Sequence, residues 1–177
     1  MGAIVVVPLP GADAGALERL AERLEYTFHR RTEIAPVRAS IDFAYDPSRD
    51  QYSSRALLAA LLQERPAHAE RLLGVTAHDL FVPVLTFVFG EAQLGGTAAA
   101  VSTFRLDNAF YGMEADAEVL QERLEKESIH ELGHTYGLLH CPDGQCVMRS
   151  STYVEDLDIK RIDFCTACAR ELAGVRA

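Results

Sequence analysis

The sequence predicts a single domain of the α/β class. A chain of 177 residues fits one domain of ordinary size, and 49% of its residues are apolar, which is enough for a hydrophobic core. Short β-branched runs alternate along the chain with longer segments whose apolar residues recur every three or four positions. The short runs predict strands and the longer segments predict amphipathic helices, so both kinds of element should share one core.

The chain begins with a predicted strand and a predicted helix. Residues 2–7 (GAIVVV) are largely β-branched and are followed by Pro8, which indicates a buried central strand. Residues 14–31 predict the first helix, and Asp13 in front of them is a suitable N-cap. The apolar face of this helix consists of Leu17, Leu20, Ala21, Leu24 and Phe28.

Shorter elements come after the first helix. Residues 33–43 predict one or two strands, and the acidic residues 45–50, which include a proline, predict a loop. Residues 52–64 carry leucines at helical spacing and predict a second amphipathic helix that ends before Pro66. Residues 71–76 then predict another strand.

Two further strands are predicted on either side of a glycine-rich connection. Residues 80–89 are almost wholly apolar, although Pro83 indicates a bulge or a late start of the strand. Residues 90–96 form the connection, and residues 97–105 predict a strand of small side chains. We expect these strands to pair as a hairpin or as neighbours at an edge of the sheet.

The small residues of the second strand suggest a place for an extended peptide. On an exposed edge, small side chains would leave the backbone open to a peptide that binds by strand addition. The candidate residues are Ala98, Ala99 and Ala100. The alternative is that alanine and glycine only mark tight packing between elements.

The longest predicted helix spans residues 114–136, and mainly helical structure is expected again over residues 154–172. The apolar face of the longest helix consists of Val119, Leu120, Leu124, Ile129, Leu132 and Tyr136. Between the two segments, Pro142, Asp143 and Gly144 predict an irregular loop. A helix buried along its length would hold the side chains near its C-terminal end rigidly.

The run HELGHTYGLLH at the end of this helix predicts a metal site. Residues four apart share a helix face, so His130 and His134 can place two imidazoles on one ion. Glu131 lies within one turn and can reach a metal-bound water as a general base, as in HExxH metalloproteases. Gly137 can adopt a left-handed conformation that reverses the chain, so that His140 returns as a third ligand. With this third imidazole the run has the spacing HExxHxxGxxH and predicts a zinc hydrolase centre.

All four cysteines lie in the last quarter of the chain, as Cys141 and Cys146 and then Cys165 and Cys168. Nothing in the sequence marks a secreted protein, so two disulfides are not favoured. Paired, closely spaced cysteines instead favour a tetrahedral four-thiolate zinc site, in which each metal–sulfur distance is about 2.3 Å. A redox-active CxxC and disulfides are the alternatives.

The charge balance and the N-terminus indicate which partners to expect. The formal net charge is −9 without a cluster of lysine and arginine, which disfavours nucleic acid as a partner. The apolar residues 1–10 have no basic leader and are too few for a membrane span or a signal peptide. We therefore expect a cytoplasmic monomer that binds neither nucleic acid nor a membrane.

Taken together, these motifs resemble the signature of the archaemetzincins, a family of metzincin-clan zinc metallopeptidases. The signature reads HExxHxxGxxHC, four residues, CxM, a loop and CxxC, and it matches residues 130–141, 146–148 and 165–168. A softer correspondence ahead of the active-site helix covers residues 95–96 and 102–105. The resemblance identifies the chain as a member of this family.

The resemblance implies a metzincin-like fold, with a twisted mixed sheet, backing helices, an active-site helix and a small zinc-stapled C-terminal subdomain. The upper subdomain would cover about residues 1–137 and the lower subdomain about residues 138–177. A cleft for a peptide or protein substrate would separate them.

The resemblance also implies two zinc ions. A catalytic zinc would be held by His130, His134 and His140, with Glu131 polarising its water. Met148 would occupy a methionine turn beneath the imidazoles, where its thioether packs rather than binds the metal. The structural zinc would be held by Cys141, Cys146, Cys165 and Cys168.

The leading hypothesis is therefore a zinc metallopeptidase that hydrolyses peptide bonds with Glu131 as general base. The chain departs from the pattern at Ser150, where some metzincins have a tyrosine; Tyr153 is nearby, and no dedicated oxyanion donor is assigned. The first alternative is a weakly active or inactive peptide-binding module that zinc only scaffolds. The second is a redox protein that uses Cys165 and Cys168. The remaining histidines, expected at the surface or in loops, are His29, His68 and His78.

Overall fold

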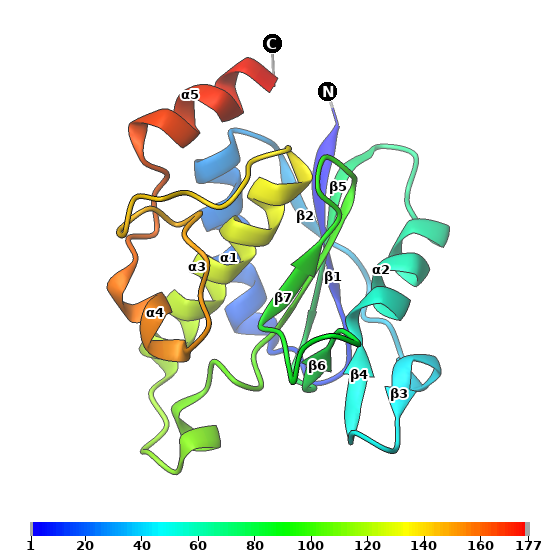
Figure 1. Ribbon diagram of the computed structural model, residues 1–177. Coiled ribbons are helices and arrows are strands. Elements are labelled where there is room, and N and C mark those ends of the chain that lie inside the picture. The colour runs from blue at the N-terminus through cyan, green and yellow to red at the C-terminus, as the bar shows by residue number, and fades with distance from the viewer. Residues whose placement is uncertain (1, 176–177) are drawn as a thin grey trace.

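A five-stranded sheet lies between two layers of helices in the computed structural model, which describes residues 2–175 (Figure 1). The strand order is β2-β1-β5-β8-β7. At one edge, β7 (Gly90–Ala92) pairs antiparallel with β8. The predicted α/β class is confirmed, and the sheet is mixed. The parallel strands are β1 (Ala3–Pro8), β2 (Thr32–Ile34), β5 (Ala69–Thr76) and β8 (Ala98–Ser102).

The helices cover both faces of the sheet. α1 (Ala14–Phe28) and α3 (Ala117–Thr135) lie on one face, and α2 (Ser54–Gln63) lies on the other (Figure 1). Because successive strand side chains point to opposite faces, Val6 of β1 belongs to the α1–α3 core and Val5 belongs to the α2 core. Each of these three helices has an N-cap residue whose side chain accepts a hydrogen bond from a backbone N–H of the first turn. The N-caps are Asp13, Ser53 and Asp116.

The C-terminal segment, residues 138–175, lies on the side of α3 away from the sheet (Figure 1). Two basic side chains of α3 attach this segment. Arg123 donates from two nitrogens to the Asp158 carboxylate, both at 2.8 Å, and Lys126 donates to the Leu157 carbonyl at 2.9 Å. The helices of the segment are α4 (Val154–Ile159) and α5 (Thr166–Val175).

Two stretches near the N-terminus differ from prediction. Within residues 33–43, where one or two strands were expected, the only strand is the end of β2. In regular parallel pairing the N–H of Val37 would donate to the Pro8 carbonyl, but the N–H of Arg38 does so instead, and the pairing ends. The loop expected over residues 45–50 instead contains a strand of a second, small sheet. The remaining short elements are β3 (Tyr45–Asp46), β4 (Gln51–Ser53), β6 (Leu80–Phe81) and two 3-10 helices, η1 (Asp42–Ala44) and η2 (Asn108–Tyr111).

The strand expected over residues 80–89 also ends early, after β6. The N–H of Leu85 turns back to the Val82 carbonyl at 3.1 Å, and Pro83 between them has no N–H for strand pairing. At the C-terminus, the helix expected over residues 154–172 is two helices separated by residues 160–165.

The prediction that Ala98, Ala99 and Ala100 form an exposed edge is wrong. Their strand, β8, pairs with β5 on one side and β7 on the other, and all three alanines are 0% exposed. The alternative, that small side chains mark tight packing, holds here. The edge strand on this side of the sheet is β7, within residues 90–96, which were predicted to form a glycine-rich connection.

Candidate active site

The C-terminal end of α3 is built to reverse the chain. Gly137 has φ +93°, a left-handed conformation that side chains other than glycine rarely adopt. Its N–H donates to the His134 carbonyl at 2.9 Å, and the N–H of Leu138 donates to the Gly133 carbonyl at 3.1 Å. These bonds end the helix, and the following residues run back toward the helix face that carries the motif.

This reversal brings together the three histidines of the motif. One ring nitrogen from each of His130, His134 and His140 lies within 4.8 Å of the others. The Nε2 atoms of His130 and His134 are 3.0 Å apart, and the His140 ring centroid is 4.9 Å from that of His134. Three imidazoles from one helix and one turn therefore point at a common centre.

Hydrogen bonds set which imidazole nitrogens face this centre. Nδ1 of His130 lies 2.8 Å from the Val147 carbonyl oxygen, and Nδ1 of His134 lies 2.7 Å from the Leu138 carbonyl oxygen. A carbonyl only accepts, so each Nδ1 carries the proton and each Nε2 keeps a free lone pair. Burial lowers the pKa of all three histidines, that of His130 most, which favours neutral rings. Neutral imidazoles oriented by carbonyls are the donor set that zinc binds.

Glu131 lies between this centre and the edge strand. A Cβ on Gly90 of β7 would lie 2.7 Å from the Glu131 Cγ and 2.9 Å from the Ala100 carbonyl oxygen. Only glycine at position 90 therefore permits such close approach of strand and carboxylate. Burial, together with the neighbouring Glu127, raises the pKa of Glu131 well above its ordinary value.

The four cysteines form a second cluster. The sulfur atoms of Cys141, Cys146, Cys165 and Cys168 all lie within 4.8 Å of one another, and all four cysteines are free thiols. The Sγ atoms of Cys141 and Cys165 are 3.7 Å apart. A tetrahedral zinc with bonds of about 2.3 Å would separate its sulfur ligands by about 3.8 Å, so the cluster fits that ion. The Cys165 N–H also donates to the Cys146 sulfur at 3.3 Å, as expected around a thiolate.

Met148 packs directly beneath the motif. Its side chain is fully buried, and a Cβ on Gly133 would lie 2.5 Å from its sulfur. The N–H of Cys141 donates to the Met148 carbonyl at 3.0 Å, which ties the two clusters to one turn. Gly133 had no predicted role. The sequence did offer a signal for such a role, because a glycine inside a helix destabilises it by about 1 kcal/mol relative to alanine.

A cleft of about 380 Å³ opens over the histidines. Its upper wall is residues 85–90, which lead into β7, and its floor contains His130, Glu131 and His140. Its lower wall includes residues 150–152. Ser150 therefore lies at the cleft, whereas Tyr153 is 68% exposed and does not line it.

The other three histidines lie outside both clusters. His29 is exposed and ends α1 in a left-handed conformation, with φ 48°. His68 is exposed and pairs with Glu33. His78 lies in a turn, with its ring stacked on Tyr52 at 4.7 Å. Their surface and loop positions match the prediction.

Comparison with known proteins points to one family of peptidases. Residues 30–174 match the model of peptidase family M54. The archaemetzincin of Pyrococcus furiosus is 40% identical over 177 residues, covering 96% of this chain and 91% of that protein. That of Archaeoglobus fulgidus is 38% identical, covering 96% of this chain and 98% of that protein.

Solved structures give the same result for the fold. The crystal structure of the Methanopyrus kandleri archaemetzincin has a TM-score of 0.84 and 34% identity, and it covers 98% of this chain and 96% of that one. The crystal structure of the A. fulgidus archaemetzincin has a TM-score of 0.82 and 36% identity, and it covers 95% of this chain and 99% of that one. The chain therefore belongs to peptidase family M54, the archaemetzincins, and is a zinc metallopeptidase.

Proposed function

We propose that the chain hydrolyses peptide bonds with a water molecule that Glu131 activates. The convergence of three neutral imidazoles beside a buried carboxylate carries this proposal. His130, His134 and His140 would hold the catalytic zinc. When bound, zinc supplies a Lewis acid that polarises the scissile carbonyl and lowers the pKa of water to about 7.

The residues of the chain would handle the proton. Glu131 takes it from the attacking water and returns it to the departing amine, so one carboxylate acts as base and then as acid. Burial against β7 limits the positions available to this side chain. Burial and the neighbouring Glu127 raise the pKa of Glu131, which makes its carboxylate a stronger base toward the proton of the water.

The second metal ion would have a structural role. The four thiols form a closed donor set, and such a site holds zinc without an open position for substrate. Cys141 directly follows His140 in the chain, so binding of the thiolate would also fix the backbone beside the third imidazole. We therefore infer two zinc ions, one in each cluster.

We infer that the substrate binds along β7. In the antiparallel pair, Phe89, Glu91 and Gln93 lie opposite β8 residues with which they exchange hydrogen bonds. The backbone groups of the residues between them, Gly90 and Ala92, therefore point away from β8. An extended peptide could pair with these groups beside Glu131, in the role first expected of the alanines of β8.

The Glu131→Gln variant tests the proposal. The variant should bind as much zinc as the parent but lose about 10²- to 10⁴-fold in kcat on a peptide library, because a neutral amide cannot accept the proton. The matched control is Glu118→Gln on the same helix, whose side chain is 76% exposed and which should keep full activity. Zinc content by elemental analysis and turnover by mass spectrometry give the two readouts.

The two alternatives give different results. A parent protein that holds two zinc ions and binds peptides without cleaving them would be a binding module. Thiols that titrate freely while zinc is present would support redox use of Cys165 and Cys168, because zinc-held thiolates resist alkylation. Among residues 2–175, none of the helices is long and apolar enough to span a bilayer.

A further inference from the structure

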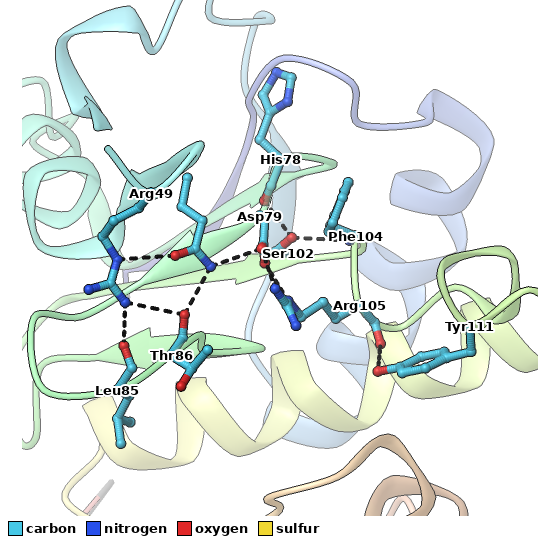
Figure 2. Close-up of polar contacts among 10 residues, drawn as sticks. Arg49, His78, Asp79, Leu85, Thr86, Ser102, Phe104, Arg105 and Tyr111 are labelled. Carbon is cyan, nitrogen blue, oxygen red and sulfur yellow. Dashed lines mark hydrogen bonds and ion pairs between the residues drawn. The ribbon is translucent and has the colours of Figure 1, made fainter. Parts of the chain in front are cut away.

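A partly buried polar cluster contacts the upper wall of the cleft at Leu85 and Thr86 (Figure 2). Its centre is an ion pair in which Arg105 donates to both carboxylate oxygens of Asp79, each at 2.7 Å. Asp79 is only 8% exposed. Two charge-assisted bonds in a planar fork fix both side chains in one orientation. Together with Arg49 and Gln51, this pair forms what we call the rim network.

The rim network reaches the cleft wall through two carbonyl groups. The side-chain amide of Gln51 donates to Asp79 at 2.9 Å and to the Thr86 carbonyl at 3.0 Å. Arg49 donates to the Leu85 carbonyl at 2.6 Å and to the Gln51 side-chain oxygen at 3.1 Å. Figure 2 shows the resulting chain of bonds from the ion pair to Leu85 and Thr86.

Arg105 also contacts an aromatic side chain of the wall, that of Phe87. Its guanidinium lies 4.3 Å from the Phe87 ring centroid and 4.7 Å from that of Phe110. Phe87 in turn packs edge-on against Phe89, with ring centroids 5.2 Å apart. Both phenylalanines line the cleft. A cation between two rings is a specific contact that fixes the Phe87 side chain.

Side chains rather than strand pairing thus hold the start of the upper wall, at Leu85 and Thr86. Within residues 85–89, the backbone bonds to neighbouring strands are those of Val88 with Leu80 and of Phe89 with Ser102. The carbonyls of Leu85 and Thr86 instead accept from Arg49 and Gln51. The height of this wall above the histidines is therefore set by residues that do not themselves line the cleft.

We propose that the rim network positions residues 85–89 for substrate and so determines how tightly the cleft holds an extended peptide. This inference rests on the proposed function. Arg105, Asp79, Gln51 and Arg49 are positioning residues, because they act through the wall and do not touch the histidine cluster. Their loss should weaken contacts along the peptide and leave the metal centre intact.

The test compares two zinc-binding probes on the zinc-loaded Arg105→Lys variant. Lysine keeps the charge but loses the two-bond fork and the flat stacking surface. The inhibition constant of the tripeptidyl probe acetyl-Leu-Leu-Gly-hydroxamate should rise about 10-fold, because a misplaced wall costs binding. Acetohydroxamate, which engages only the metal, should bind within about 2-fold of the parent value. For a peptide substrate, KM should rise while kcat changes little.

Matched variants separate positioning from folding. Arg38→Lys changes an arginine of similar exposure, 22% against 20% for Arg105, in an ion pair with Glu64, and should leave both probes unaffected. Asp79→Asn should repeat the Arg105→Lys result. The double variant should lose less binding free energy for the tripeptidyl probe than the sum of the two single losses, because both substitutions remove the same ion pair.

Each outcome bears on one of the two hypotheses. Equal weakening of both probes would place the effect at the metal centre and overturn the inference, as would unchanged affinity for the tripeptidyl probe. The parent protein tests the proposed function independently, since it must bind the tripeptidyl probe at least about 10-fold more tightly than acetohydroxamate. A parent that fails this comparison, or that never cleaves a peptide, overturns the proposed function.

Discussion

The two walls of the cleft are held in place by different interactions. The upper wall belongs to the sheet, whose strands bury apolar side chains on both faces against α1, α2 and α3. The lower wall belongs to residues 138–175, whose two helices have only 6 and 10 residues. Helices this short are not stable on their own.

Polar groups replace strand pairing in the C-terminal segment. Lys160 is 2% exposed and donates to the carbonyls of Val147 and Arg149 at 3.2 Å and 2.8 Å. The Val147 carbonyl also accepts from His130, so the segment and the histidine cluster share one peptide group. The upper wall should therefore be stable without metal, whereas the lower wall should depend on it.

Removing the metal from the cysteine cluster should have the largest effect. The Cys146→Ser variant should loosen residues 138–175 before the sheet, because zinc in a four-thiolate site contributes on the order of 10 kcal/mol to folding. Hydrogen exchange followed by mass spectrometry should show lost protection in this segment and retained protection in β1 and β5. If sheet and segment lost protection together, the two walls would not differ as described.

Truncation in the sheet core should have the next largest effect and a different distribution. Leu20 is 0% exposed in the α1–α3 core, so Leu20→Ala should cost about 2–5 kcal/mol of unfolding free energy. Zinc content at both clusters should stay the same while the folded state persists. Denaturant unfolding and elemental analysis give the two values, and metal loss at mild destabilisation would contradict the separation.

The contact between the two parts can be tested at Gly133. A methyl group there would press on the Met148 sulfur, and this clash should lower the free energy of unfolding of Gly133→Ala by about 1–3 kcal/mol. The higher helix propensity of alanine should offset up to about 1 kcal/mol of that loss. Gly174→Ala in α5 is the control, because no atom lies within 4 Å of the added carbon. The shifts in melting temperature of the two variants should differ in sign or clearly in size, and equal shifts would rule out the clash.

The smallest expected effect concerns the stability of the metal-free protein. Burial raises the folded-state pKa of Glu131 above its ordinary value of 4.5, so its ionised form destabilises the folded state at neutral pH. Metal-free Glu131→Gln should therefore be more stable than the metal-free parent at pH 7. This advantage should shrink as the pH falls through the raised pKa and vanish below about 4.5, where both states of the parent are protonated. An advantage that persisted at low pH would contradict this electrostatic origin.

The histidine cluster was predictable because its geometry is local. His130, His134 and His140 lie within one helix and one turn, so spacing and a glycine suffice to predict that they meet. The first strand, the helices α1, α2 and α3, and the N-cap Asp13 follow equally from local pattern.

The edge of the sheet was not predictable in the same way. Whether β7 or β8 lies outermost depends on the order of strands that are far apart in sequence, and β8 looks like an edge only because its side chains are small. The same limit applies to residues 82–89. Their apolar composition predicts a strand, but the groups that satisfy the carbonyls of Leu85 and Thr86 lie more than 30 residues earlier.

The brevity of β7 has a consequence for behaviour at high concentration. An open sheet edge invites another copy of the chain to add a strand, and long flat edges promote aggregation for this reason. With three residues, β7 offers unpaired backbone groups from Gly90 and Ala92 only. A peptide held at its other contacts can use these groups, whereas a neighbouring molecule would gain too few bonds from them to remain attached.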